Sequence, residues 1–314
     1  MKKRFLFIIA LLTCVSAIRG QYDSQLSQYF MALGYYNPAY AGTSGDLNIL
    51  ALSRLQWVGI KGAPRSFFIN ADMPLKLGKT NHGVGLTVFY DGIGLFKNTH
   101  LGVQYAYKYN LFGGTLSGGL QLGIVNQSFD GEGVYYPSSQ FHQTKDEAIP
   151  QTQVSGMGFD INAGLYYKRK DWYAGFGVTH LNKTEILLDE YSYMYLSSTY
   201  NLVGGYNIKF NNPLYELQPS VFLKTDMQVF QADITARLFF NNMFNGGFSW
   251  RVNESVILLL GAKFGSFQVG YAYDYPTTAL FAKTSGSHEL VVSYKLKLKK
   301  SKTGKNRHKS VRIL

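Results

Sequence analysis

After its N-terminal region the chain lacks both cysteine and long apolar runs. Its single cysteine is Cys14, so the residues that follow can form neither a disulfide nor a cysteine-ligated metal site. Their apolar runs are short, as in Val256 to Leu260, which has five residues. A transmembrane helix needs about 20 predominantly apolar residues. Beyond the first twenty residues, the sequence therefore excludes transmembrane helices.

The central part of the chain also lacks net charge, although the whole chain carries +12 at pH 7. Of the 31 Lys and Arg residues, four lie in the first twenty residues and nine in the last twenty. The other 18 are balanced by 19 Asp and Glu residues, which leaves −1. Nucleic-acid binding needs a basic patch, and only the C-terminal tail offers one. We therefore expect no nucleic acid among the partners.

The chain instead contains a series of segments, each about ten residues long, in which apolar and polar side chains alternate. In one of them the apolar face consists of Phe230, Ala232, Ile234, Ala236, Leu238 and Phe240. The opposite face carries Gln231, Asp233, Thr235 and Arg237. Charges at that density do not suit a dry core, whereas a membrane barrel has one face toward lipid and one toward a wet lumen. The 24 Tyr and 22 Phe residues fit such a barrel, because aromatic residues collect at both membrane interfaces.

Turn residues divide the alternating region into fourteen predicted strands. These strands are expected at 47–58, 64–74, 83–91, 99–110, 114–128, 157–168, 171–180, 193–210, 215–226, 229–240, 245–253, 255–264, 267–275 and 287–298. The even number favours an all-β fold, a 14-stranded antiparallel transmembrane β-barrel of the outer membrane. The alternative, a soluble β-sandwich, would be large for a single domain and would expose charged strand faces on both of its sheets.

The predicted connections between strands differ in length in a regular way. The long ones, 129–156, 181–192 and 276–286, each follow an odd-numbered strand, whereas several short ones follow even-numbered strands. Bacterial barrels have short periplasmic turns and longer external loops. We therefore expect both termini of the mature chain in the periplasm and the barrel in the cell outer membrane.

The N-terminal region divides into two segments. Residues 1–20 have the basic, apolar and small-residue sections of a secretory signal peptide, with cleavage after Ala17 or after Gly20 left open. Residues 21–44 are too irregular for a barrel strand and are expected to form a periplasmic or hatch-like segment that folds into or beneath the barrel. The barrel itself is assigned to residues 45–298.

Residues 299–314 form a basic tail, which is expected to extend into the periplasm. Its candidate partner-binding residues are Lys299, Lys300, Lys302, Lys305, Arg307, Lys309 and Arg312. Such a tail could contact a peptidoglycan-associated protein, an acidic partner or the inner lipid leaflet. A solvated extension without a partner explains the same residues equally well.

The sequence contains no convincing catalytic or metal-binding constellation, so we expect neither an enzyme nor a cofactor. The histidines are widely spread, and none has the paired spacing of a metal site. The loop 129–156 contains Asp130, Glu132, Asp146 and Glu147. A surface calcium site there is conceivable, but solvated loop carboxylates are the favoured interpretation.

Charged side chains are expected on the face of the strands that lines the lumen. They are Arg54, Asp72, Lys108, Asp160, Lys168, Lys224, Asp233, Arg237 and Arg251. A selectivity ring would favour one sign, whereas these residues carry both. We therefore expect them to form a salt-bridge network that closes the lumen at rest.

Several segments, taken in order, resemble the PorP/SprF family of outer-membrane proteins of the type IX secretion system in Bacteroidota. They are SQY (27–29), YYNPAYAG (35–42), RLQWVGIKGAPRSF (54–67), GVGLTVFYDGIG (83–94), LQPSVFLK (217–224), GYAYDYPTTAL (270–280) and GSHELVVSYKL (286–296). Each motif is weak by itself, but the ordered set covers nearly the whole mature chain and is specific.

The resemblance implies a non-enzymatic component of type IX protein secretion, and in gliding relatives a role in adhesin attachment. The partners it implies are the periplasmic lipoprotein ring, a peptidoglycan-binding periplasmic protein, the C-terminal domains of secreted cargo and outer-membrane lipid. The barrel is also similar to the long-chain fatty-acid transporter type, which has an N-terminal hatch with an Asn-Pro-Ala element. Asn37, Pro38, Ala39 and Tyr40 are the corresponding structural hatch motif here.

Other functions remain as alternatives. A transporter of hydrophobic small molecules would need a lateral opening, for which Pro219 inside the ninth predicted strand is the one candidate, since proline interrupts the hydrogen-bond ladder. A general porin is disfavoured by fourteen strands and a lumen of mixed charge, and an outer-membrane enzyme is the weakest alternative.

Overall fold

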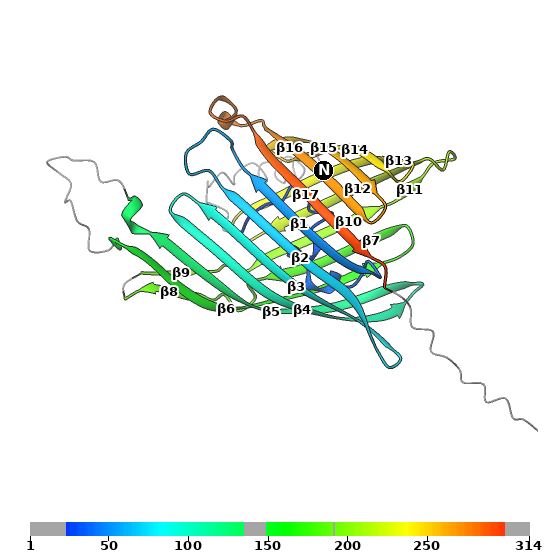
Figure 1. Ribbon diagram of the computed structural model, residues 1–314, viewed down its shortest axis with the longest axis horizontal. Coiled ribbons are helices and arrows are strands. Elements are labelled where there is room, and N and C mark those ends of the chain that lie inside the picture. Colours follow the sequence, from blue (N-terminus) through cyan, green and yellow to red (C-terminus); the bar gives the residue numbers. More distant parts are fainter. Residues whose placement is uncertain (1–22, 135–148, 191, 299–314) are drawn as a thin grey trace, which may run out of the picture.

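The chain folds into a closed antiparallel β-barrel of fourteen strands (Figure 1). The computed structural model describes residues 23–134, 149–190 and 192–298. The first seven barrel strands are β1 (Leu47–Leu55), β2 (Arg65–Leu77), β3 (Thr80–Ile93), β4 (Phe96–Leu111), β5 (Gly114–Asp130), β6 (Gln153–Lys168) and β7 (Trp172–Thr179). The others are β10 (Thr199–Tyr206) with its continuation β11 (Ile208–Lys209), β12 (Tyr215–Thr225), β13 (Phe230–Phe240), β14 (Phe244–Arg251), β15 (Ser255–Phe264), β16 (Phe267–Pro276) and β17 (Ser287–Leu296).

Hydrogen bonds run around the whole ring. The first and last strands pair from Leu47 opposite Leu296 to Leu55 opposite His288. The pairing of β10 with β12 completes the circle. The predicted 14-stranded barrel is thus confirmed.

One predicted strand, 193–210, begins too early. Ser192–Tyr195 is a separate short strand, β9, which pairs with β8 (Glu185–Asp189) in a two-stranded hairpin outside the ring. Tyr193 and Tyr195 alternate at odd positions, whereas the outward side chains of β10, such as Leu202 and Tyr206, lie at even positions. The prediction joined two segments whose alternation is out of phase. The predicted loop 181–192 therefore contains structure of its own.

The two ends of the barrel differ in the length of their connections. At one end, which we call the long-loop end, lie 56–64, 131–152, 180–198 and 277–286, together with three shorter connections. At the other, which we call the short-turn end, the longest connection is 210–214, with five residues. The three long connections predicted from the sequence thus all lie at the same end.

Side chains alternate between the lumen and the outer surface, as the sequence predicts. In β13, Phe230, Ile234 and Leu238 are exposed on the outside, whereas Asp233 and Thr235 are buried inside. An apolar outer surface of this kind suits lipid. No helix in the described ranges is long and apolar enough to span a membrane.

Pro219 interrupts the wall without opening it. Pairing with β12 stops after Gly205 opposite Ser220 and resumes at Ile208 opposite Leu217, so the register is unchanged across the gap. On its other side Pro219 pairs normally with Ala236. The proline therefore removes local hydrogen bonds, as expected from its missing N–H, but leaves the neighbouring strands in place.

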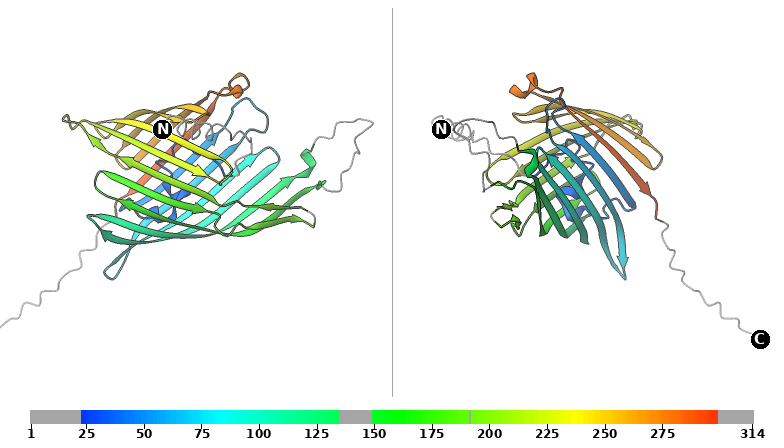
Figure 2. Two further views of the ribbon diagram at one scale, coloured as in Figure 1. Left: turned by 180° about the vertical axis from the view of Figure 1, so that it is seen from behind. Right: turned by 60° about the vertical axis from the view of Figure 1, so that its left-hand side comes forward.

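Residues 24–46, which we call the plug, lie inside the barrel (Figure 2). They form the short helix α2 (Leu33–Tyr36), the 3-10 helix η1 (Pro38–Tyr40) and turns. The Asn37 side chain accepts a hydrogen bond from the Ala39 N–H, and Pro38 follows at the first position of η1, where its missing N–H costs nothing. The segment begins near β12 in the long-loop half and reaches β1 at the short-turn end.

The orientation of side chains predicts a stability difference between two arginine substitutions. Val103→Arg places a charge in the middle of β4 on the outer surface and should destabilise the folded barrel by about 2–4 kcal/mol. Phe112→Arg, in the turn between β4 and β5, should change stability by less than about 1 kcal/mol. Urea unfolding in lipid vesicles measures both, and equal effects would contradict the assigned outer face.

Candidate functional site

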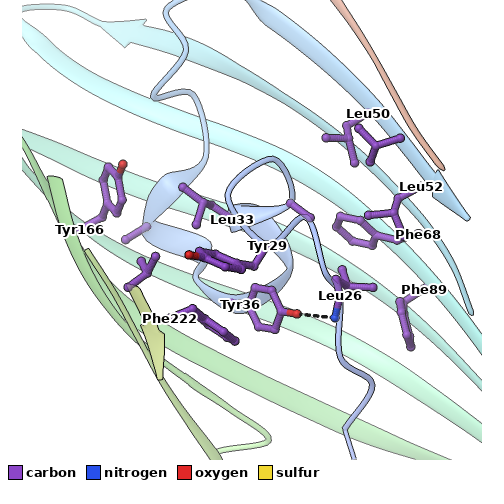
Figure 3. Packing of buried hydrophobic residues seen from close by; sticks show 14 residues of the cluster. Leu26, Tyr29, Leu33, Tyr36, Leu50, Leu52, Phe68, Phe89, Tyr166 and Phe222 are labelled. Carbon is purple, nitrogen blue, oxygen red and sulfur yellow. Dashed lines mark hydrogen bonds between the residues drawn. The ribbon is translucent and has the colours of Figure 1, made fainter. Parts of the chain in front are cut away.

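The plug is held first by an apolar cluster shared with the barrel wall (Figure 3). From the plug the buried members are Leu26, Tyr29, Ala32, Leu33, Tyr36 and Ala39. From the wall they are Leu50, Leu52, Phe68, Phe89, Tyr166, Val203, Phe222 and Val291. The wall residues come from strands all around the ring, so the lumen face that looks polar in the sequence contains apolar positions where the plug lies.

Two tyrosines of the plug combine this apolar packing with hydrogen bonds. The Tyr29 ring stacks on Phe222 at a centroid distance of 5.0 Å, and its hydroxyl lies 2.8 Å from the Ser220 hydroxyl. The Tyr36 ring lies 4.5 Å from Phe222, and its hydroxyl accepts a hydrogen bond from the Leu26 N–H at 3.0 Å. A buried tyrosine needs such a partner for its hydroxyl, and here the plug and the wall supply them.

The Asn-Pro-Ala motif lies against wall glycines. The Asn37 amide donates hydrogen bonds to the carbonyls of Leu165 (2.9 Å) and Phe176 (3.3 Å) in β6 and β7. A Cβ atom at Gly119 would overlap the backbone of Pro38 and Ala39, and one at Gly164 would overlap the Asn37 side chain. The motif fits because these wall positions have no side chain.

A network of buried charges holds the other end of the plug. Arg54 contacts Asp274 at 2.7 Å and Glu289 at 3.3 Å. Arg251 contacts Asp274 at 3.0 Å and Asp233 at 3.1 Å. The five residues come from β1, β13, β14, β16 and β17 and are almost completely buried. Three of the nine charges predicted to form a salt-bridge network, Arg54, Asp233 and Arg251, belong to it.

The network binds the plug as well as the wall. Ser27 donates its N–H to Glu289 at 2.7 Å and its hydroxyl to Asp274 at 2.7 Å, and it accepts a hydrogen bond from Arg54 at 2.6 Å. The Gln28 N–H donates to the second Glu289 oxygen at 2.7 Å. Two backbone N–H groups of an irregular segment thus find charged acceptors, which gives the stronger kind of hydrogen bond.

Two further anchors lie at the ends of the plug. Near its start, Lys224 donates to the Asp23 carbonyl at 2.6 Å and faces the Asp23 carboxylate at 3.8 Å. Burial by itself would raise the pKa of the Asp23 carboxyl, but the Lys224 ammonium holds that pKa below its usual range. Near the end of the plug, the Gly42 N–H donates to Asp72 at 2.8 Å.

A separate buried group lies on β4, β6 and the turn after β7. Asp160 contacts His180 Nδ1 at 2.8 Å and His100 Nε2 at 3.1 Å. The His180 carbonyl accepts a hydrogen bond from Ser198, which precedes β10. The group cross-links the wall below the β8–β9 hairpin. Among the described residues, no three His, Cys, Asp or Glu side chains are arranged to hold a metal ion.

Most of the lumen charges predicted from the sequence lie where they were expected. Arg54, Asp72, Asp160, Lys224, Asp233, Arg237 and Arg251 are buried, whereas Lys108 and Lys168 are at least partly open to solvent. The prediction missed Asp274, Glu289, Ser27 and Gln28. The alternation of Tyr271, Tyr273 and Tyr275 and of Leu290 and Val292 already placed Asp274 and Glu289 on the inner face. The contacts of Ser27 and Gln28 had no signal in the sequence.

Other sequence predictions fall on residues outside the described ranges. They are the signal peptide 1–20, part of the long loop with Asp146 and Glu147, and the tail 299–314 with its candidate partner-binding residues. The placement of both termini stays a prediction for the same reason.

Comparison with models of known protein families assigns the chain to a family. A family model described as "Type IX secretion system membrane protein PorP/SprF" matches residues 18–294, nearly the whole chain. The match confirms the resemblance that the ordered motifs indicate. The comparison with curated proteins finds no match.

Solved structures with a similar course of the chain include two toluene transporters. TbuX of Ralstonia pickettii has a TM-score of 0.49 and 12% identity, over 85% of this chain and 93% of that one. TodX of P. putida has a TM-score of 0.46 and 11% identity, over 83% and 92%. A FadL homologue of Pseudomonas aeruginosa has a TM-score of 0.44 and 8% identity, over 79% and 89%. Likenesses at this level carry no information on what this chain binds.

Removing one charge from the network should strongly destabilise the barrel. Arg54→Met leaves Glu289 buried without its arginine, and breaking a buried pair from one side costs about 3–5 kcal/mol. Arg65→Met, at an exposed position of β2, is the matched control and should cost less than about 0.5 kcal/mol. Urea unfolding in lipid measures both values. Adding Glu289→Gln to Arg54→Met should recover part of the loss, and strictly additive losses would contradict the pairing.

A methyl group at the seat of the Asn-Pro-Ala motif should displace the plug. Gly119→Ala puts a Cβ into the Pro38 and Ala39 backbone. Ala32→Cys introduces a reporter thiol at a position that is buried in the intact plug. This thiol should react with a bulky maleimide several times faster when Gly119→Ala is also present than when it is absent. Gly204→Ala is the control, since its Cβ would meet only the Tyr173 carbonyl at 3.8 Å. Equal labelling rates in the two variants would show that the plug does not depend on this contact.

Proposed function

The chain belongs to the PorP/SprF family of type IX secretion system membrane proteins, and we propose that it serves this system as a non-enzymatic scaffold. In this role it links secreted cargo at the cell surface to the lipoprotein ring in the periplasm. The observation that carries the proposal is the plug, which occupies the lumen and is ion-paired and packed against strands all around it. A barrel filled in this way is suited to holding partners at its two ends.

The mixed signs of the lumen charges support a scaffold over a porin. A selective pore presents charges of one sign to the passing ion. Here Arg54 and Arg251 are satisfied by Asp233, Asp274 and Glu289, which leaves these groups paired with one another. Such a closed set of ion pairs favours a lumen that stays shut at rest.

The long-loop end is the proposed cell-surface end, because outer-membrane barrels have longer external loops. There the β8–β9 hairpin packs through Ile186 against Val125 and Leu196. Its opposite face leaves Leu187, Tyr193 and Tyr195 60%, 54% and 57% exposed. Clustered exposed apolar residues are typical of interaction sites, and this face is our candidate contact for the C-terminal domains of cargo.

The short-turn end then faces the periplasm. The described chain ends there at Leu298, directly before the basic residues 299–314. We assign to this end the contacts with the lipoprotein ring and with a peptidoglycan-binding protein. Lys299, Lys300 and the other cations of the tail are the proposed docking residues.

The transporter alternative needs a path through the wall or past the plug. In the sequence, Pro219 was the one candidate for such a path. In the structure, the wall is paired in the same register on both sides of that proline. At the long-loop end β6 pairs with β7 only from Ala163 to Lys168, and strand β8 of the hairpin lies beside the rest of β6. The scaffold is therefore the function we propose.

Deleting the gene should abolish secretion or surface attachment of proteins that carry the type IX C-terminal signal. Fractionation of cells and medium, with immunoblots for a cargo protein, measures this. The wild-type gene and the Arg65→Met control should restore secretion. Cargo that is still secreted and anchored without the gene would refute the proposal.

Purification from detergent extracts tests the periplasmic link separately. The ring components should copurify with the full chain, and mass spectrometry identifies them. Glutamine at all seven tail cations should remove the ring, while leaving the barrel folded on unheated gels. A ring retained by that variant would show that the tail is not the dock.

A further inference from the structure

The lumen has two cavities beside the plug at the short-turn end, and together we call them the basic vestibule. The larger, about 430 Å³, lies between plug residues 42–46 and strands β2 to β6. The smaller, about 270 Å³, lies between Tyr40 of the plug and strands β12 to β17. The plug forms the floor of both, and the paired strands form their walls.

The side chains that line the vestibule are mostly cationic. Lys76, Lys108 and Lys168 line the larger cavity, where Asp46 is the one carboxylate in the lining. Lys263, Lys295 and Arg237 line the smaller cavity, whose described lining contains no carboxylate. Over the two cavities the lining thus contains six cations and one carboxylate, although the whole barrel region is nearly neutral.

These cations differ from those deeper in the lumen, which have acidic partners. Arg54, Arg251 and Lys224 each contact a carboxylate. In the part of the chain that the structure describes, none of the five vestibule lysines forms an ion pair. Lys108 donates a hydrogen bond to the Thr43 hydroxyl at 2.8 Å. The Arg237 guanidinium lies 3.6 Å from the centre of the Phe30 ring and donates a hydrogen bond to the Gln218 side chain. Both cations thus contact neutral groups.

Unpaired charges of one sign at close range repel one another. Lys168 experiences the charge of Lys295, Lys295 that of Lys263, and Lys108 that of Lys168, and the buried Asp72 carboxylate offsets part of this repulsion at Lys108 and Lys295. Walls of low dielectric constant focus such a field into the cavity. An anionic group that entered the vestibule would relieve this repulsion and gain attraction to several ammonium groups together.

We propose that the basic vestibule is a binding site for an acidic peptide segment, one with several Asp or Glu side chains, of a partner protein. Residues 299–314 contain no Asp or Glu, so this chain's own tail has the wrong charge to fill it. Only the placement of the partner in the periplasm rests on the proposed function.

A peptide fits the vestibule better than an anionic lipid does. The wall around it is paired except for the local gap beside Pro219, where the strands keep their register. The acyl chains of a lipid in the lumen therefore could not reach the bilayer. Leu75 and Tyr166 in the larger cavity and Phe239 in the smaller add apolar contacts between the lysines. Alternating carboxylates and apolar groups match a polypeptide chain.

The test uses the full-length protein in detergent and a fluorescent peptide of eight glutamates. Lys108→Gln, Lys168→Gln and Lys295→Gln, introduced together, should weaken binding about tenfold. Glutamine at Lys61, Lys97 and Lys183 makes the same change of charge at the long-loop end and should leave the affinity unchanged. Binding should also weaken steeply with salt.

Carbodiimide cross-linking locates the peptide, because it joins carboxylates only to lysines in direct contact. Cross-links at Lys108, Lys168 or Lys295 are the expected result, and cross-links confined to 299–314 would overturn the proposal. Equal affinity of the two triple variants would overturn it as well. So would capture of anionic-lipid vesicles through the vestibule lysines without any binding of the peptide. These measurements need no secretion assay, so their failure is distinguishable from that of the proposed function.

Discussion

A ring of fourteen strands encloses more space than its inward side chains can fill, and the rest of the molecule depends on this constraint. Barrels of about eight strands are filled by their own side chains, and barrels of about 16 to 18 leave a water channel. This barrel lies between the two and fills its lumen with residues 24–46 of the same chain. The inner face is therefore apolar where Tyr29 and Tyr36 lie and charged where the plug backbone needs partners.

The charged partners make an irregular segment possible at membrane depth. Backbone N–H groups away from water need acceptors, and irregular backbone at this depth is tolerated only inside protein or a wet cavity. Glu289 accepts from two of these groups, and Arg54 balances its charge. Burying such ions costs several kcal/mol each, so the network stabilises the plug only while all its members are present.

The sequence predicted the wall much better than the contacts inside it. The alternation of apolar and polar side chains located the strands, because a period of two is visible in every strand that faces lipid. The same alternation assigned Asp233 and Arg251 to the inner face. It failed at Tyr193 and Tyr195, whose alternation belongs to a hairpin. The partners Ser27 with Asp274 and Asn37 with Leu165 join residues more than a hundred positions apart. Pairings of that kind depend on how the closed ring brings strands together, which no local pattern contains.

The network around Glu289 also constrains the order of assembly. Arg54 belongs to the first strand, whereas its partners Asp274 and Glu289 belong to the last two. A chain still being synthesised or inserted therefore has a plug without its main acceptors and an arginine without its counter-charge. Only when β17 pairs with β1 does the plug gain Glu289. Only in the closed ring does the plug therefore have all of its charged hydrogen-bond acceptors, so closure of the barrel and final seating of the plug are a single event.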